Sequence, residues 1–486
     1  MKILNSLSSD WINSHPVFYN TKTFKTSTNI NDVVEWHNFE FDKEGLYNYL
    51  KFGYLVFEKT VFKNVLRLRH SSVINITEEN GVRGYEIIEG EDAVLKKLDG
   101  KKTGDECINM IKDHVNAFEK KIGDGRILLP LSGGHDSRLL FSFVEDKSKI
   151  DAITYDVSMS MKYSHESACA FALTCQSEVN WKNILVNNYF TKHYAEKNFN
   201  TFGLEKPIHA SYHFEMYDQA TKLFDTSRST ILSGSVGDWW SGEKVQLARL
   251  ENWQDAEKLF FNHNISIPKE FIEVKADESY NESIIAPQLN LLKESDVYRT
   301  VFSRRGRMGL SGYIMRTAEA YLPTYTPFYD IDLATSQLHL SSEDRQNRMW
   351  QKNYFDSIGM GVGITTDLNI SYSTDYSQDL QAMSYALSKD LLINLNEKEL
   401  GEFVSKKRIQ WINSKLEELK KIPVEFIAYT SNSLYSLDNN QNPHGKSGPL
   451  FEKIYSSSFN IGEINKAIVE WSVLAPLQMA INRRNK

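Results

Sequence analysis

The sequence predicts an α/β protein in which a doubly wound parallel sheet follows a small β-rich domain and precedes a helical C-terminal part. Three observations support this fold class. Between 105 and 231, apolar runs of strand length alternate with stretches of helical periodicity. Two of these runs, at 127–131 and 230–232, continue directly into loops of small residues. At 486 residues the chain also exceeds the length at which a single core usually stops growing, so we expect several domains.

Residues 1–95 alternate short β-rich runs with turns, which is typical of a small sheet domain. A charged, glycine-containing stretch at 96–104 has the composition of a linker. We expect the remaining domains at 105–380 and 381–486, the second being a helical extension of the first. A loop at 431–448 is predicted to be a lid or a connection. The clearest helical periods cover 251–262, 397–421 and 461–482.

The segment 127–138, with the sequence ILLPLSGGHDSR, is the most informative part of the chain. Its apolar half predicts a buried parallel strand, and the residues after it predict the start of an amphipathic helix. Ser132, Gly133 and Gly134 lie between the two and have little or no side chain. Backbone N–H groups can therefore come close to an anion at the N-terminus of the helix, where the helix dipole adds to the attraction. This arrangement is typical of a phosphate-binding loop.

Two polar side chains follow the glycines in the same turn. Asp136 would repel a phosphate there, so we interpret its carboxylate as a ligand for the Mg²⁺ that accompanies a nucleotide, or as a helix cap. The hydroxyl of Ser137 suits either role. An ordinary serine-glycine turn with an aspartate cap is the alternative, since short glycine-rich motifs also occur by chance.

The loop resembles the Ser-Gly-Gly-x-Asp-Ser motif of the ATP-pyrophosphatases, which cleave ATP between its α and β phosphates, and Arg138 makes it most similar to asparagine synthetases. Three further regions resemble that family in the same order. The run 150–157 and the stretch 165–175 are similar to the strand whose end reads adenine and to the helix after it. The segment 230–242, TILSGSVGDWWSG, resembles the family's second signature, Ser-Gly-Glu-Gly-x-Asp-Glu. The segment 316–333 resembles its Pro-Phe-x-Asp region.

The resemblance implies an adenine nucleotide alpha hydrolase-like synthetase domain that uses ATP and Mg²⁺. Asp238 falls on the signature aspartate, which binds Mg²⁺ and pyrophosphate, so Asp136 and Asp238 are the implied metal ligands and catalytic residues. The residues implied to bind the nucleotide are Leu131, Ser132, Gly133, Gly134, Asp136, Ser137, Arg138, Tyr155, Asp156, Val157, Ser233, Gly234 and Gly237.

The chain also departs from the family pattern. Ser235 stands where the second signature has its first glutamate, and Trp239 stands where it has the later one. A lysine that stabilises the transition state in asparagine synthetases has no clear counterpart, and Lys352 in the segment RQNRMWQK is the best catalytic substitute. For Arg345, Arg348 and Lys352 the simpler interpretation is a solvated helix face, given their i, i+3, i+7 spacing.

The N-terminal region resembles the end of the glutaminase half of asparagine synthetases. Glutamine-dependent members begin with a catalytic cysteine whose thiolate attacks the glutamine amide. Position 2 is Lys2 in this chain, and the three cysteines, Cys107, Cys169 and Cys175, are all internal. The resemblance therefore implies a degenerate glutaminase-like domain without nitrogen-releasing chemistry. The amine would come from free ammonia, from a separate glutaminase or from the substrate itself.

The composition disfavours several other classes of protein and of site. The net charge of −7 disfavours a nucleic-acid carrier, and the absence of an 18-residue apolar stretch or a signal peptide predicts a cytoplasmic protein without a membrane partner. The cysteine spacing predicts neither disulfides nor zinc, and Cys169 and Cys175 are expected as apolar core residues of one helix. His209 and His213 have the i, i+4 spacing of a zinc pair, but without an acid between them structural or cleft histidines are favoured.

These observations together predict an ATP-dependent amide-forming ligase. A carboxylate would attack the α-phosphorus of ATP and release pyrophosphate, after which the acyl group would pass to ammonia or an amine. The resemblance implies a small carboxylate substrate: a sugar acid, an amino acid or a peptide. Two other classes remain open, namely a catalytically silent nucleotide-binding relative that acts through a partner and a tRNA-modifying ATP-pyrophosphatase. Ser235 and the missing lysine favour the first, whereas the second would normally show a basic face.

Overall fold

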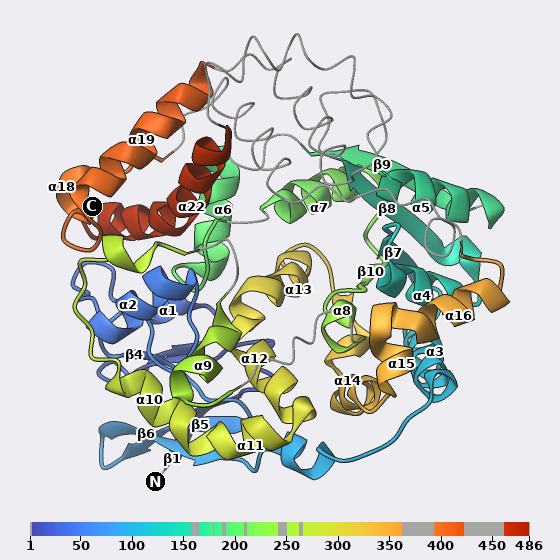
Figure 1. Cartoon of the computed structure of the whole chain (residues 1–486), viewed down its shortest axis with the longest axis horizontal. Coiled ribbons are helices and arrows are strands. Elements are labelled where there is room, and N and C mark those ends of the chain that lie inside the picture. The colour runs from blue at the N-terminus through green and yellow to red at the C-terminus, as the bar shows by residue number, and fades with distance from the viewer. Residues whose placement is uncertain are drawn as a thin grey trace.

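The computed structural model describes residues 2–156, 165–177, 179–186, 191–208, 211–241, 250–261, 266–361, 393–421 and 461–485. These residues form a mixed α/β structure, which confirms the expected class. A parallel sheet with its helices occupies one side of the molecule, and the N-terminal elements and the C-terminal helices occupy the other (Figure 1). The middle of the chain supplies the helices that lie between these two sides.

The parallel sheet has five strands in the order β11-β10-β7-β8-β9, and every neighbouring pair is parallel. Its central strand, β7, is buried because partners flank it on both edges: Ile127 pairs with Ile150 of β8 and with Thr230 of β10. The strand order reverses at β7, and such a reversal opens a crevice at the carboxyl ends of the strands. The strands are β7 (Arg126–Pro130), β8 (Ile150–Asp156), β9 (Asn180–Leu185), β10 (Ser229–Leu232) and β11 (Thr324–Tyr325).

Helices before and after the strands carry clear sequence signals. The helix before β7 begins with a capping box, in which Thr103 and Glu106 satisfy each other's backbone N–H groups. The helix after β7 begins directly after the second glycine of the small-residue loop, Gly134, which is its N-cap. The helices closest in sequence to the sheet are α3 (Gly104–Ile122), α4 (His135–Phe143), α5 (His165–Gln176), α6 (Lys192–Phe202), α7 (Tyr212–Leu223) and α8 (Gly237–Trp240).

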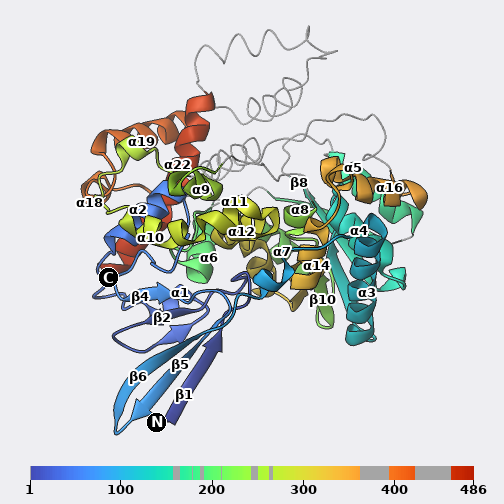
Figure 2. The ribbon, with the colours of Figure 1, turned by 60° about the horizontal axis from the view of Figure 1, so that its bottom comes forward.

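The N-terminal part consists of two small antiparallel sheets and two helices. One sheet has the order β1-β5-β6 and projects from the body of the molecule, and the other has the order β3-β2-β4 (Figure 2). A small cluster that includes Val17, Tyr19, Ile74 and Ile76 is buried here. The elements are β1 (Lys2–Ser8), β2 (Phe18–Asn20), β3 (Thr26–Ser27), α1 (Ile30–Val33), α2 (Lys43–Phe52), β4 (Val65–Arg67), β5 (Ser72–Glu79) and β6 (Val82–Glu89).

Beyond residue 250 the described chain is mainly helical. The period at 251–262 forms one short α-helix followed by a 3₁₀ turn, and the period at 397–421 is broken into two helices before Ser405, which caps the second. In the described ranges, no helix is long and apolar enough to cross a bilayer. The helices are α9 (Trp253–Glu257), α10 (Ser279–Ile285), α11 (Leu289–Glu294), α12 (Asp296–Ser311), α13 (Tyr313–Glu319), α14 (Ile331–Leu338), α15 (Ser342–Arg345), α16 (Met349–Ser357), α18 (Glu397–Leu400), α19 (Lys406–Lys420) and α22 (Ile461–Arg484).

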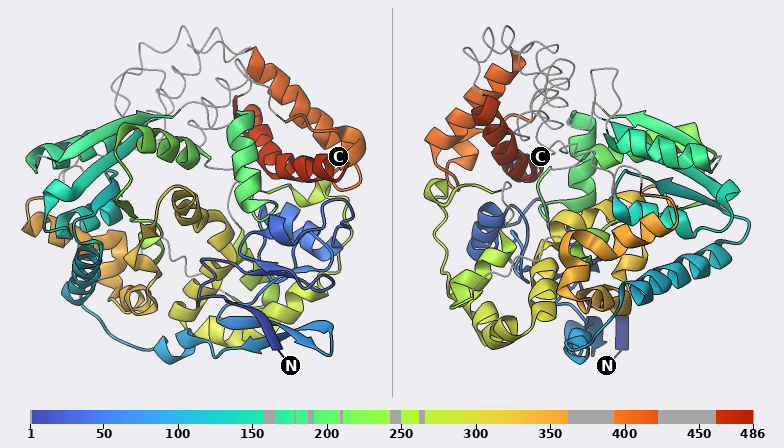
Figure 3. Two further views of the ribbon diagram at one scale, coloured as in Figure 1. Left: turned by 180° about the vertical axis from the view of Figure 1, so that it is seen from behind. Right: turned by 45° about the vertical axis from the view of Figure 1, so that its right-hand side comes forward.

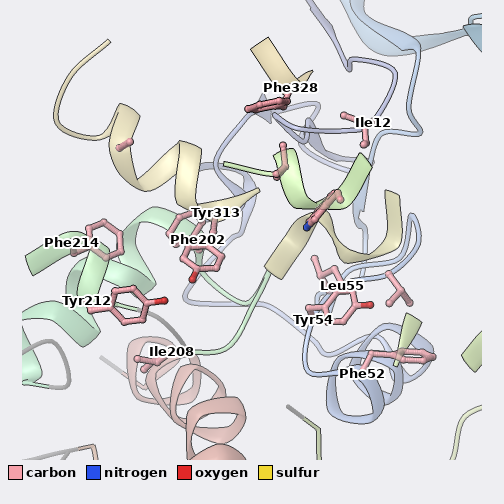
Figure 4. Packing of buried hydrophobic residues seen from close by; sticks show 14 of the residues in the cluster. Ile12, Phe52, Tyr54, Leu55, Phe202, Ile208, Tyr212, Phe214, Tyr313 and Phe328 are labelled. Carbon is pink, nitrogen blue, oxygen red and sulfur yellow. The ribbon is translucent and has the colours of Figure 1, made fainter. Parts of the chain in front are cut away.

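The N-terminal part packs tightly against the later helices. The Tyr49 hydroxyl of α2 donates to the Val473 carbonyl of α22 at 3.0 Å, and helices α19 and α22 lie side by side above α2 in both views of Figure 3. Lys51 forms a buried ion pair with Glu257 at 2.7 Å. Buried residues of the N-terminal part, such as Phe52 and Tyr54, therefore belong to the same hydrophobic cluster as the core of the parallel sheet (Figure 4).

Lys206, between α6 and α7, has its ammonium group enclosed by protein. The Nζ atom lies 4.5 Å from the centre of the Phe202 ring and 4.2 Å from that of Tyr313, and it donates to the Pro207 carbonyl at 3.2 Å. Burial lowers the pKa of Lys206 to about 7, although the nearby Glu205 partly opposes this shift. The side chain is therefore partly neutral at neutral pH.

This buried lysine makes stability depend on pH. Between about pH 7 and pH 10.5 the unfolded chain binds more protons than the folded protein, so the stability contribution of Lys206 rises with pH across this window and is level below it. The substitution Lys206→Met removes the effect. We expect its stability advantage over the wild type, at most about 5 kcal/mol at pH 7, to shrink as the pH approaches 10. Urea unfolding of both proteins at three pH values measures this, and a constant difference would contradict it.

Candidate functional site

Two small-residue loops of similar construction follow the neighbouring strands β7 and β10. In the first loop the Ser132 hydroxyl accepts the N–H of Gly134 at 3.1 Å, and in the second the Ser233 hydroxyl accepts the N–H of Ser235 at 3.2 Å. Each loop leads into a helix, and Asp136 and Asp238 lie in the first turns of α4 and α8. Because both strands are parallel and adjacent, these carboxylates are carried to the same edge of the sheet.

The two loops touch each other through glycine. A Cβ atom built on Gly237 would lie 2.5 Å from the Asp136 Cγ atom, and one built on Gly234 would lie 2.8 Å from the backbone nitrogen of Ser137. Only residues without a side chain allow this approach. The glycines of the second loop thus place its backbone directly against the first turn of α4.

Asp136 and Asp238 line the same cavity, which has a volume of about 280 Å³. It opens at the carboxyl ends of β7, β8 and β10, where the strand order reverses. The loops, helix α7, helix α13 and the turn before α16 all contribute to its walls. The lining residues are Pro130, Leu131, Ser132, Gly134, His135, Asp136, Ser137, Ile153, Thr154, Tyr155, His213, Met216, Tyr217, Ser233, Gly234, Ser235, Asp238, Ile314 and Arg348.

Asp136 has polar neighbours in α16 and in the turn before it. The Arg348 Nη1 atom lies 3.8 Å from its Oδ2 atom, and Gln351 donates from Nε2 to its Oδ1 atom at 3.4 Å. Arg348 is only 9% exposed, and both it and Asn347 adopt left-handed backbone angles, with φ values of 56° and 52°. Such conformations cost free energy in non-glycine residues and often occur at functional sites. The strained turn places the guanidinium group of Arg348 beside the carboxylate of Asp136.

Arg348 corrects one of the sequence interpretations. The spacing of Arg345, Arg348 and Lys352 favoured a solvated helix face, but the left-handed residues interrupt the helix between α15 and α16 and turn Arg348 into the cavity. Lys352, the predicted catalytic substitute, lies on α16 and is not a lining residue. Among the described lining residues, the cation beside Asp136 is therefore Arg348.

A further left-handed residue lies in the loop between β10 and α8. Val236, the residue before α8, has a φ of 62° and is 4% exposed. A β-branched residue is strongly disfavoured in this conformation, so the surrounding contacts must hold it. Its conformation lets the chain turn from β10 into α8 so that Asp238 reaches the cavity.

His135 lies beside Asp136 at the cavity wall, between several cations. Burial, and then the charges of Arg348 and Arg138, lower its pKa to about 3, so the imidazole is neutral at neutral pH. Around this cavity, the described polar atoms without a hydrogen-bond partner include His135 Nε2 and Gln351 Oε1. Buried polar atoms in folded proteins nearly always have partners, so these atoms point to a ligand-binding region.

The first loop is partly closed on itself. The N–H of Ser132 donates to the Ser137 hydroxyl at 3.1 Å, and the N–H of Gly134 is bound as described above, so two of the predicted phosphate donors contact serine oxygens. Arg138 is fully buried, where it donates to the carbonyls of Gly133 at 2.9 Å and Met360 at 2.7 Å. Arg138 thus supports the loop from behind instead of facing the cavity.

The predicted adenine-reading segment lies at the end of β8. Leu131, which donates its N–H to the Ile153 carbonyl at 2.8 Å, joins the loop to this strand, and Tyr155 lines the cavity. The Asp156 carboxylate accepts hydrogen bonds from Ser167 and Asn183, both at 2.7 Å, and is buried. Val157 lies outside the described residues, as does the predicted loop at 431–448.

The structure also places most of the remaining residues that the sequence singled out. His213 lines the cavity, which agrees with a cleft histidine, whereas His209 lies outside the described residues. In the part of the chain that the structure describes, no group of three or more potential metal ligands occurs. Cys169 and Cys175 share α5, but only Cys169 is buried, so the expectation of a core residue is wrong for Cys175. Asp330 of the Pro-Phe-x-Asp region caps α14 by accepting the N–H of Leu333 at 2.9 Å.

Neither a model of a known protein family nor a curated protein matches the chain. The chemistry of the cavity follows from its own groups, which include two carboxylates, a guanidinium, two imidazoles and several hydroxyls around two glycine-bearing turns. Carboxylates suit hard cations such as Mg²⁺, and guanidinium groups suit phosphate oxygens. The residues that sequence reasoning missed include His135, Gln351, Met216, Tyr217 and Ile314, and Arg348 was assigned to an exposed helix face.

Gly237 provides a test of the contact between the loops. The substitution Gly237→Ala would push the Asp136 carboxylate out of its position, and rotation cannot relieve the whole contact, because the new Cβ would also lie 2.9 Å from the Asp136 Cβ atom. We expect a loss of unfolding free energy of about 1–3 kcal/mol and at least tenfold weaker binding of Mg²⁺ with ATP, measured by calorimetry. Gly84→Ala is the matched control, because its Cβ would meet Thr77 Oγ1 at an ordinary 3.5 Å on the exposed strand β6.

Proposed function

We propose that this protein is an ATP-dependent amide-forming ligase, which adenylates a carboxylate, releases pyrophosphate and passes the acyl group to ammonia or an amine. The observation that carries the proposal is the pair Asp136 and Asp238. Each lies in the first turn of a helix that follows a strand and a small-residue loop, and both line one cavity. Loops of this kind suit a phosphate chain, and paired carboxylates suit the cation bound to it.

The topology supports the finer fold assignment. A strand order of β11-β10-β7-β8-β9, with the cavity at the point of reversal, is expected for a doubly wound sheet of the adenine nucleotide alpha hydrolase type. We also propose that the N-terminal part is a degenerate glutaminase-like domain, with ammonia or a separate glutaminase supplying the amine. Residues 1–95 contain no cysteine, which supports this part of the proposal.

Two carboxylates fit Mg²⁺, which usually takes one or two protein carboxylates and completes its shell with phosphate oxygens and water. Asp136 and Asp238 would hold it. When bound, Mg²⁺ supplies charge neutralisation for pyrophosphate as that group leaves. The chain itself supplies further positive charge for the phosphate groups. The guanidinium of Arg348 lies 3.8 Å from Asp136.

The proposed reaction has two steps. In the first, an oxygen of the substrate carboxylate forms a bond to the α-phosphorus of ATP, and the bond from that phosphorus to the bridging oxygen breaks, so that pyrophosphate leaves. Arg348 and the two loops would orient the phosphate chain for this attack. In the second, the amine nitrogen attacks the acyl carbon, loses a proton, and AMP departs with the carbon–oxygen electron pair.

The test is an assay of the full chain with ATP, Mg²⁺ and either ammonium or hydroxylamine. Sugar acids, amino acids and short peptides are offered as carboxylates, and both pyrophosphate and AMP are measured. The proposal requires equal amounts of both products, formed only when a carboxylate is present. Binding of ATP without any turnover across the panel would overturn the ligase assignment and support the catalytically silent alternative.

A further inference from the structure

The loop between β1 and β2 reaches the helix that carries Asp238. The centre of the Trp11 ring lies 5.8 Å from that of the Trp240 ring, and the two ring planes are tilted by 37°. Trp240 is fully buried and lies in α8, two residues after Asp238. Aromatic pairs at this separation attract each other and prefer particular geometries. A residue of the N-terminal part therefore contacts the short helix that bears one of the two cavity carboxylates.

Both indole rings are also bonded to one short turn. The Trp11 indole N–H donates to the Tyr329 carbonyl at 2.9 Å. The Trp240 indole N–H donates to the neighbouring Phe328 carbonyl, also at 2.9 Å. These carbonyls belong to the 3₁₀ turn Pro327–Tyr329, in which Phe328 is fully buried. The turn therefore holds one ring from the N-terminal part and one ring from α8 in a single arrangement.

The backbone of the loop is anchored around Trp11. The Asp10 carboxylate accepts the N–H of Ile12 at 2.8 Å, and Arg305 of α12 donates from Nε to the Trp11 carbonyl at 2.9 Å. The same guanidinium donates two hydrogen bonds of 2.7 Å to the Asp92 carboxylate, and both side chains are mostly buried. Bidentate pairs of this kind fix geometry as well as adding stability. Trp11 is thus held through its backbone and through its ring.

Helix α8 needs support from outside itself. It spans only four residues, and helices this short are unstable on their own. It also begins at Val236, whose left-handed backbone persists only where surrounding contacts hold it. Trp240 supplies such contacts, because its ring is enclosed and its indole nitrogen is bonded. Since Asp238 lies in the same helical turn, contacts that fix the Trp240 ring also fix Asp238.

We propose that Trp11 is a positioning residue for the cavity, which holds the Trp240 ring and thereby keeps Asp238 in place for a divalent cation. The inference rests on the proposed function for the identity of the cation. Loss of the Trp11 ring would leave space beside Trp240, so α8 could shift and the two carboxylates would lose their common geometry. Groups that orient metal ligands commonly change metal affinity by about tenfold or more. The N-terminal part thus serves the cavity without any nitrogen-releasing chemistry.

The decisive variant is Trp11→Ala in the full chain. Calorimetry measures the affinity for ATP once with Mg²⁺ and once with a chelator, and the ratio of the two affinities is the gain that the cation supplies. We expect Trp11→Ala to reduce this gain by about threefold to tenfold, with an unchanged binding stoichiometry. A lower stoichiometry with an undiminished gain would assign Trp11 to the fold alone and overturn the inference.

Trp36→Ala is the matched control. Trp36 belongs to the same N-terminal part, is half-buried like Trp11, and its indole N–H donates to the Asn31 carbonyl at 3.0 Å. Its ring packs against three phenylalanines, including Phe199 of α6. We expect Trp36→Ala to lower the melting temperature while the Mg²⁺-dependent gain stays within about twofold of the wild type. An equal loss of this gain in both variants would overturn the inference.

The milder variant Trp11→Phe keeps an aromatic ring beside Trp240 but loses the hydrogen bond to the Tyr329 carbonyl. Its Mg²⁺-dependent gain should lie between those of the wild type and Trp11→Ala. If Trp11→Ala does not fold, a loss of about twofold in Trp11→Phe supports the inference, and an undiminished gain overturns it. A wild-type affinity for ATP that does not respond to Mg²⁺ would contradict the metal assignment of the proposed function, and this inference with it. A normal wild-type response that the Trp11 variants share would overturn this inference and leave the proposed function standing.

Discussion

Replacing Asp238 with asparagine is expected to slow ATP-dependent pyrophosphate release by about 10²–10³-fold while the protein remains folded. An amide oxygen carries no net charge, so it holds Mg²⁺ weakly and cannot keep the cation on the departing pyrophosphate, an effect of several kcal/mol. Asp238 lies in the first turn of α8 and borders the cavity, so the substitution leaves no buried charge without a partner. The measurement is the initial rate of pyrophosphate formation at saturating ATP across a Mg²⁺ titration. The variant should also require more Mg²⁺ for half-maximal rate.

A matched control separates charge in the cavity from charge elsewhere. Asp330 caps α14 and does not line the cavity, and asparagine is an equally good N-cap, so Asp330→Asn should leave both rate and stability nearly unchanged. The corresponding change at Asp136 should resemble that at Asp238, because the two carboxylates are proposed to share one cation. Wild-type rates in both cavity variants would remove the basis of the metal assignment.

The sequence predicted the parts of this site that local patterns determine. Apolar runs located β7, β8 and β10, and the serine-glycine loops after β7 and β10 placed Asp136 and Asp238 at neighbouring strand ends. These elements are visible in sequence because strand burial and helix starts depend on a few consecutive residues. The two-residue strand β11 was not visible, since its pairing with β10 involves too few residues to leave a pattern.

Other features depend on contacts between distant parts of the chain. The break between α18 and α19 falls inside a continuous helical period, and the periodicity gave no sign of it. Arg348 reaches Asp136 across 212 positions, through a turn whose left-handed residues carry no glycine signal. Regular i, i+3, i+7 spacing therefore indicated an exposed helix face at the point where the backbone departs from a helix. Strain at that turn is the kind of local conflict that functional sites retain.

Arg348 is expected to be the cation on which the reaction depends, and Arg348→Met should lower the rate of pyrophosphate release by about 10²-fold. Its guanidinium lies in a mostly buried position beside Asp136, where Coulomb interactions with a phosphate chain are weakly screened. Arg348→Lys keeps the charge but loses the planar fork of donors, so we expect partial activity. Rates measured with ATP and the best carboxylate of the panel, together with the affinity for tripolyphosphate, separate a loss of binding from a loss of rate.

Lys352→Met is the discriminating control for this prediction. Lys352 lies one helical turn away on α16 and contributes to the positive field at His135, but it does not line the cavity. The Lys352→Met variant should retain more than about half of the wild-type rate, because the half-buried charge of Lys352 lies outside the cavity and is screened by solvent. The substitution Asn347→Gly is a second control. Glycine accepts the left-handed conformation, so Arg348 should stay in place and the rate should remain close to that of the wild type. If Lys352→Met loses more activity than Arg348→Met, the essential cation is Lys352, and the turn that carries Arg348 serves the fold alone.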